Sequence, residues 1–153
     1  MPTPEERLQE LGVSLPAPAT PVAAYVPCVR TGDLVYVSGQ VPMVDGKPSH
    51  LGHLGDDVDL EAGRAAARTC AVNVLAALKA ELGELSRVRR VVKVTGFVAS
   101  TADFTDHPKV VNAASELFGD VFGDAGRHAR AAVGVSALPL GVPVEVEAIV
   151  EAT

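Results

Sequence analysis

The stretch that decides the fold is the end of the chain, GRHARAAVGVSALPLGVPVEVEAIVEAT (126–153). It holds two apolar runs rich in valine, 129–137 and 144–152, joined by LPLGVP. Runs of β-branched residues bounded by proline and glycine are typical of β-strands. One residue does not fit a purely structural strand, because Arg130 places a guanidinium near the start of the first run. We therefore expect two strands, with a polar group of possible function on one of them.

The rest of the chain is expected to supply three more strands, two of them paired in a hairpin, and two main helices. Residues 25–30 and 34–38 flank the turn signal Thr31-Gly32-Asp33 and predict a β-hairpin. The segment 60–82 repeats apolar residues at helical spacing and ends before Gly83, which predicts a helix. A strand over 89–100 and a second helix over 108–118 follow. Before and between them we expect a short helix starting at Thr3, an extended lead-in over 14–21, and a loop over 41–57.

This order, ββ-α-β-α-ββ, has no internal repeat and no linker, so residues 1–153 are expected to form a single domain. Strands gathered into one sheet with both helices on one face make an α+β sandwich. Two helices can cover only one face, yet the strands are apolar on both. An exposed apolar sheet of this size normally packs against a partner, so we expect a closed homo-oligomer with ligand clefts between subunits.

Composition narrows the functional classes. The chain is 48% hydrophobic, carries a net charge of −6 and is only 4% aromatic. Such a chain can bury a core, and its acidity and few aromatics make nucleic acid an unlikely partner. It has no apolar signal core and no run long enough to span a membrane. Cys28 and Cys70 form no Cys-x-x-Cys pair and are expected to be reduced core residues of a cytoplasmic protein.

Three polar features could carry chemistry. The side chain of Arg130 either extends its guanidinium into solvent at the end of the strand or binds a carboxylate through two hydrogen bonds. Glu145 and Glu147 share one face of the last strand, where they either meet solvent or activate water. Ser38-Gly39 ends a strand, where glycine allows a ligand to approach the backbone.

The remaining candidates are weaker. His50 and His53 lie in an irregular loop without acidic or cysteine ligands at a recognised spacing, so no metal site is expected. His107 and His128 are isolated in the sequence. The glycine-rich segments match neither the dinucleotide nor the phosphate-loop template, and we expect no cofactor.

Read together, these motifs resemble the Rid/YjgF family of small trimeric proteins. The resemblance covers nearly all of the chain after Pro21. It rests on Tyr25, on TGDLVYVSGQVP (31–42), on the VVKVTGFV strand, on Asn112 before ELF, and above all on ARAAVGVSALPLGVPVEVEAIV (129–150). The chain is most similar to a longer branch often labelled endoribonuclease L-PSP/chorismate mutase-like.

The resemblance implies a chorismate-mutase-like fold, with three subunits packing their sheets into a central barrel and binding ligands at the subunit interfaces. It also implies an enamine/imine deaminase, which hydrolyses 2-imino acids to 2-keto acids and ammonia without a cofactor. Arg130 then matches the arginine that binds the substrate carboxylate, and Glu145 the residue that positions water. The other residues carried over line or support the pocket: Tyr25, Ser38, Gly39 and Asn112.

The sequence departs from the deaminase branch at three places. It has Val26-Pro27-Cys28 after the tyrosine, Ala132 where cysteine is common, and a longer segment between Phe104 and Asn112. These departures alter the pocket, so the alternative is a non-catalytic protein that binds small carboxylates or regulates. Ribonuclease activity is a less favoured third reading, because the chain is acidic and poor in aromatic residues.

Overall fold

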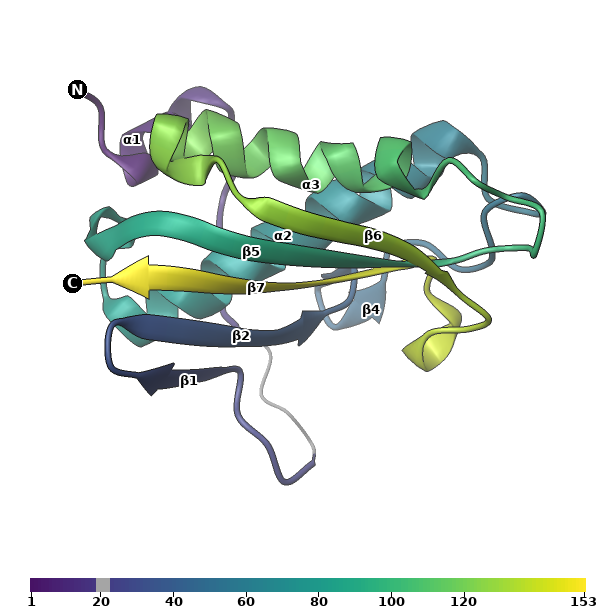
Figure 1. The fold of residues 1–153 in the computed structure, drawn as a ribbon, viewed down its shortest axis with the longest axis horizontal. Coiled ribbons are helices and arrows are strands. Elements are labelled where there is room, and N and C mark those ends of the chain that lie inside the picture. The colour runs from purple at the N-terminus through teal and green to yellow at the C-terminus, as the bar shows by residue number, and fades with distance from the viewer. Residues whose placement is uncertain (19–22) are drawn as a thin grey trace.

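Five strands form one mixed sheet in the computed structural model, which describes residues 1–18 and 23–153. Across the sheet the order is β1 (Cys28–Thr31), β2 (Leu34–Gln40), β7 (Val144–Ala152), β5 (Val88–Ala99) and β6 (Ala129–Val135). Neighbouring strands are antiparallel except β5 and β6, which are parallel (Figure 1). A parallel pair needs a long crossover, and helix α3 (His107–Phe122) lies in that connection.

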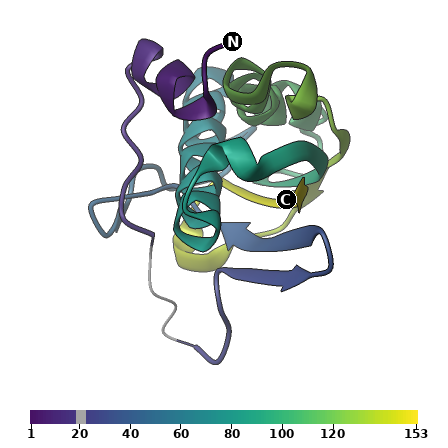
Figure 2. The same ribbon diagram turned by 90° about the vertical axis from the view of Figure 1, so that its left-hand side faces the viewer.

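Helices α2 (Leu60–Leu82) and α3 both lie on the same face of the sheet, as the view along the strands also shows (Figure 2). The predicted ββ-α-β-α-ββ order and the α+β class are therefore confirmed. Smaller elements complete the chain. They are the helix α1 (Pro4–Glu10), a hairpin of β3 (Met43–Val44) and β4 (Lys47–Pro48), and three 3₁₀ turns, η1 (Leu85–Arg87), η2 (Gly123–Gly126) and η3 (Pro139–Gly141).

Helix α2 has the predicted bounds because both ends are capped. The Asp59 side chain accepts a hydrogen bond from the Ala62 N–H, and Gly83 ends the helix at a φ of 84° that glycine adopts without strain. Alanine is the commonest residue on the buried side of α2, and Cys70, Val74 and Leu78 are among the larger members. These small side chains let the helix pack closely on the sheet.

The sheet is just as regular on its helix-facing side. Alternate residues of β7, from Val144 to Ala152, are buried, while Glu145 and the other odd-numbered residues are partly exposed. In β5, Gly96 lies under α3, and a Cβ at this position would overlap the side chain of Val111. Glycine at 96 therefore sets how closely α3 approaches the sheet.

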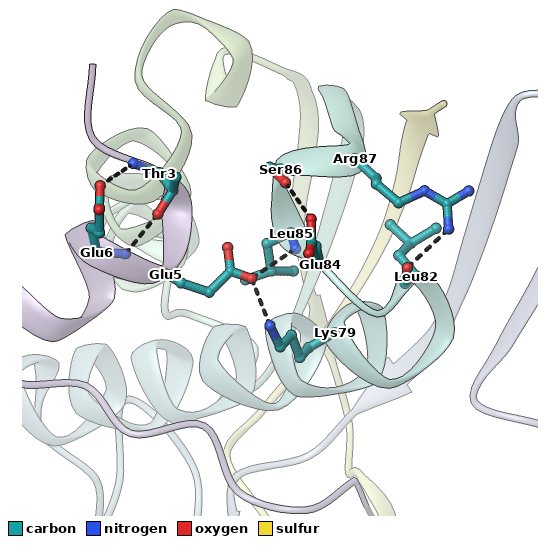
Figure 3. Close-up of polar contacts among 9 residues, drawn as sticks. All are labelled: Thr3, Glu5, Glu6, Lys79, Leu82, Glu84, Leu85, Ser86 and Arg87. Carbon is teal, nitrogen blue, oxygen red and sulfur yellow. Dashed lines mark hydrogen bonds and ion pairs between the residues drawn. The ribbon is translucent and has the colours of Figure 1, made fainter.

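Helix α1 is fixed to the end of α2 by one carboxylate (Figure 3). The Glu5 carboxylate accepts hydrogen bonds from Lys79 Nζ at 2.8 Å and from the Leu85 N–H at 2.9 Å. Partial burial raises the pKa of Glu5, but the hydrogen bonds to its carboxylate together with the charge of Lys79 leave the pKa below its ordinary value. The helix begins after Thr3, where the sequence predicts a helix start, and Thr3 and Glu6 form a capping box there.

Several predicted boundaries were wrong. The first strand begins at Cys28 rather than Tyr25, because Pro27 has no N–H to donate to a ladder. The second helix continues from 118 to Phe122, since Val121 and Phe122 remain buried. The hairpin of residues 43–48 lies within the segment predicted to be a loop. Of the predicted extended lead-in, residues 14–18 are described and have no regular structure, whereas 19–21 lie outside the described residues.

On the other face of the sheet, the described part of the chain places no helix. Tyr36 and Val133 are 45% and 43% exposed on strands of this sheet. Alongside them, Lys93, Thr95 and Glu147 line a shallow depression. We call this side the open face. Within residues 1–18 and 23–153, no helix is both long and apolar enough to cross a lipid bilayer.

Candidate functional site

Arg130 lies at the start of β6, the edge strand next to α3. Its parallel partner in β5 is Val94, which is fully buried beneath the helices, so Arg130 also points to the helix side. Its Nη1 donates to Asn112 Oδ1 at 2.8 Å and to Ser115 Oγ at 3.2 Å, both on α3. The structure thus brings together Arg130 and Asn112, two of the predicted site residues, and adds Ser115.

The other edge of this guanidinium has no partner among residues 1–18 and 23–153. Among the described residues, no carboxylate lies within 4.0 Å of Arg130, and Nε and Nη2 make no hydrogen bond. None of the buried side-chain nitrogens and oxygens there lacks a partner, so these two nitrogens are accessible to solvent. An Nε/Nη2 edge of this kind matches the two oxygens of a carboxylate.

Behind Ser115 lies His128, which the sequence left isolated. His128 Nε2 is 2.8 Å from Ser115 Oγ, and Nδ1 is 2.6 Å from the Gly126 carbonyl oxygen. The imidazole also packs edge-on against Phe118, with ring centroids 6.1 Å apart. The signal that could have found this group is spacing. Asn112 and Ser115 are three residues apart on a helix, and His128 and Arg130 are two apart in sequence where β6 begins.

A second group of predicted residues gathers where β2 ends beside β7. Glu145 pairs with Phe97 across the sheet and, by alternation with buried Val144 and Val146, points to the open face. Its carboxylate lies so close to Gly39 that a Cβ there would overlap Oε2. Gly39 falls within the irregularity in the β2–β7 pairing between Val37 and Gln40. Glycine at 39 therefore makes room for the carboxylate.

Burial is the main reason that the pKa of Glu145 is raised, and the charge of Glu147 on the same face raises it further. A carboxyl group with a raised pKa exchanges protons closer to neutral pH than an ordinary glutamate does. The prediction that Glu145 and Glu147 share a face is confirmed by the burial pattern of β7.

Ser38 and Tyr25 lie near Gly39 in different settings. The Ser38 hydroxyl donates to the Val26 carbonyl at 2.7 Å, which ties the start of β1 to β2. Tyr25 is 57% exposed and, with Gly39 and Asn73, lines a cavity of about 420 Å³. Four predicted residues (Tyr25, Ser38, Gly39 and Glu145) thus belong to this end of the sheet.

The two groups do not meet in one chain. Arg130 points toward α3 from β6, whereas Glu145 points to the open face from β7. Strand β5 lies between β7 and β6, so the two strands are about 10 Å apart. A single ligand cannot contact both side chains of the same chain in this arrangement.

The other titratable candidates have structural partners. His50 Nδ1 is 2.8 Å from Ser49 Oγ, and His53 Nε2 is 2.8 Å from the Ser136 carbonyl. Cys28 and Cys70 are free and buried, as predicted for core residues. Burial raises the pKa of Cys28 to about 11 and that of Cys70 well above its ordinary value, so neither is a nucleophile at neutral pH. No set of three or more potential ligands for a metal ion occurs in the described part of the chain.

Comparison with known proteins identifies the family of the chain. Residues 5–151 match the family described as YjgF/chorismate mutase-like, "putative endoribonuclease". Protein TCP17 of Trypanosoma cruzi is 49% identical over 145 residues, covering 94% of this chain and 91% of that protein. A 2-iminobutanoate/2-iminopropanoate deaminase of Salmonella typhimurium is 36% identical over 133 residues, covering 87% of this chain and 90% of the deaminase.

Among solved structures, Atu1372 of Agrobacterium tumefaciens, a protein of unknown function, superposes with a TM-score of 0.93. It is 50% identical, and the match covers 99% of this chain and 94% of that one. The residues matched by the family run from α1 to the end of β7 and include both groups of site residues. The chain is therefore a member of the YjgF/chorismate mutase-like family.

Proposed function

We propose that this protein is an imine deaminase that hydrolyses small 2-imino acids to 2-keto acids and ammonia, at sites between the subunits of a homotrimer. The observation that carries the proposal is the state of Arg130. Arg130 has no carboxylate partner among the described residues. Its Nη1 donates to two neutral side chains, while Nε and Nη2 are accessible to solvent. The deaminases among the relatives support this chemistry.

The positions of the two groups support an assembly of several copies. Arg130 is on an edge strand and Glu145 is on the open face, so a second copy has to supply one of them to any shared ligand. A head-to-tail contact of this kind closes into a ring when the rotation between copies fits. The same contact would cover the exposed Tyr36 and Val133.

Each side chain then has one task. Arg130 holds the carboxylate of the imino acid and places its C=N carbon beside a water molecule. Glu145 of a neighbouring copy accepts a proton from that water as its oxygen bonds to the imine carbon. Glu145 passes this proton to the imine nitrogen, which gives a tetrahedral carbinolamine. The hydroxyl proton of the carbinolamine then moves by way of Glu145 to the nitrogen as the C=O bond forms and the C–N bond breaks, so that water and the imino acid become the keto acid and ammonia. The imine carbon is already electrophilic, and the reaction needs no cofactor.

The cysteines, the net charge and Arg130 support a cellular compartment and a class of ligand. The two free, buried cysteines favour a reducing compartment, and we propose the cytoplasm. The family description also mentions endoribonucleases, but a chain of net charge −6 has little attraction for RNA. The expected partner is a small monocarboxylate, since the site offers one unpaired guanidinium.

The test is ammonia release from freshly generated 2-iminopropionate, beside calorimetric titration with 2-ketobutyrate. Removing a guanidinium from a bound carboxylate costs about 2–5 kcal/mol, so Arg130→Ala should weaken the keto acid by about 30-fold or more. The matched control is Arg127→Ala, an exposed arginine three residues away. Binding without turnover would indicate a carboxylate-binding or regulatory protein. Unchanged affinity in Arg130→Ala would refute the site.

A further inference from the structure

A chain of hydrogen bonds leads from the backbone to the guanidinium. It begins at the Gly126 carbonyl, passes through His128 (2.6 Å) and Ser115 (2.8 Å), and reaches Arg130 Nη1 (3.2 Å). The resemblance to deaminases assigns no role to His128 or Ser115. Both are partly buried, and they lie on the side of Arg130 away from its solvent-accessible edge.

Chemistry fixes the direction of each hydrogen bond. The Gly126 carbonyl can only accept, so His128 Nδ1 carries the proton that it receives. In the neutral ring, Nε2 then holds a lone pair and accepts the hydroxyl proton of Ser115. The Ser115 oxygen is left with its lone pairs, one of which accepts from Arg130. Each donated hydrogen in this series of hydrogen bonds has one acceptor, and the hydroxyl hydrogen of Ser115 points to His128 and away from Arg130.

This arrangement determines how the guanidinium is held. The two hydrogens of Nη1 are used by Asn112 and Ser115, so the planar group cannot rotate without breaking one of the bonds. A long arginine side chain otherwise loses rotamer freedom when it binds a ligand. Fixing its plane beforehand reduces that loss and improves binding of a planar carboxylate.

We infer that His128 is a positioning residue: through Ser115 it sets the orientation in which Arg130 receives the carboxylate. The inference rests on the proposed function for the nature of the ligand. His128 and Ser115 thus act together on Arg130, separately from the hydrogen bond between Arg130 and Asn112. The affinity for the carboxylate should therefore depend on a hydrogen-bond acceptor at the position of His128 Nε2, whether or not an imidazole supplies it.

Two substitutions separate these properties. In His128→Gln, the terminal amide can place an oxygen near the Nε2 position and keep the acceptor for Ser115. In His128→Asn, the amide reaches only the Nδ1 position, so the bond to Gly126 can persist while Ser115 loses its acceptor. Ser115→Ala removes the link from the other side. Melting temperature and oligomeric state are measured for every variant.

We expect Ser115→Ala and His128→Asn each to weaken 2-ketobutyrate about five- to tenfold, the net worth of one ordinary hydrogen bond. His128→Gln should stay within about twofold of wild type. The double variant Ser115→Ala/His128→Asn should be no weaker than either single one, since both cut the same path. In the imine assay, the loss should appear in KM while kcat is kept. Equal weakening by His128→Gln and His128→Asn, or additive losses, would overturn the inference.

A measurement without ligand separates this inference from the proposed function. Nitrogen NMR of Arg130 should show slow rotation of the guanidinium in wild type and His128→Gln, and fast rotation in Ser115→Ala and His128→Asn. If wild type binds no 2-keto acid, the proposed function fails, and the rotation rates still decide whether His128 positions Arg130. The same rotation rate in all four proteins would refute the positioning role.

Discussion

Two inactive variants of this protein should restore each other's activity when their subunits mix. Arg130→Ala lacks the carboxylate-binding group and Glu145→Gln lacks the proton acceptor. Arg130 and Glu145 lie on opposite faces of one sheet and about 10 Å apart across the strands, so in the proposed homotrimer each site takes the two side chains from different chains. A mixed trimer can therefore contain a site with one intact Arg130 and one intact Glu145.

The expected recovery follows from counting. In the proposed ring of three chains, a trimer that holds both variants has three interfaces, and one of them joins an intact Arg130 to an intact Glu145. Ammonia release by mixed trimers should therefore return to about one third of wild type. If both side chains came from the same chain, every site would lack one of them.

The assay uses the two variants co-expressed with different tags and purified through both tags, so that only mixed trimers remain. Each variant treated in the same way alone is the control, and mass spectrometry of the intact assembly confirms the subunit composition. Mixed trimers with no more turnover than the two parents would show that the site does not join Arg130 of one chain to Glu145 of another.

Three further outcomes test the site and its surroundings. Gly39→Ala should displace the Glu145 carboxylate, because its Cβ would overlap Oε2, and should lower kcat with little change in the affinity for 2-ketobutyrate measured by calorimetry. Glu147→Gln removes a like charge that raises the pKa of Glu145, so the acidic limb of the pH–rate profile should move to lower pH; an unmoved limb would exclude Glu145 as the titrating base. A Cys28→Ser/Cys70→Ala double variant should keep full turnover, and in wild type neither buried thiol should react with a thiol reagent before unfolding; loss of activity in a folded double variant would contradict this.

The fold could be predicted well because hydrophobic periodicity and local chemistry agree along the chain. The alternation of β7 and the helical repeat of α2 each fix which side faces the core, and the caps at Asp59 and Gly83 fix where α2 begins and ends. The hairpin of residues 43–48 escaped prediction because strands of two residues show no periodicity.

The site was predicted in its parts but not in its connections. The resemblance indicated Arg130 and Asn112, and in the structure Arg130 Nη1 lies 2.8 Å from Asn112 Oδ1. It did not indicate His128. Spacing places Asn112 and Ser115 on one side of α3 and His128 and Arg130 on one side of the chain where β6 begins, but the contact between the two pairs depends on how the end of α3 returns to β6. Nor could the sequence show that Arg130 and Glu145 point to opposite faces, since this depends on the pairing register of three strands.

The placement of the aromatic residues decides what the protein's own fluorescence can report. There is no tryptophan, and the two tyrosines, Tyr25 and Tyr36, are 57% and 45% exposed. Tyr36 lies on a strand of the sheet that the proposed assembly would cover, and Tyr25 lines the cavity beside Gly39. Tyrosine emission in this protein is therefore a signal from its surfaces. A denaturation curve recorded by emission would follow the separation of subunits, whereas circular dichroism would follow the unfolding of the chain.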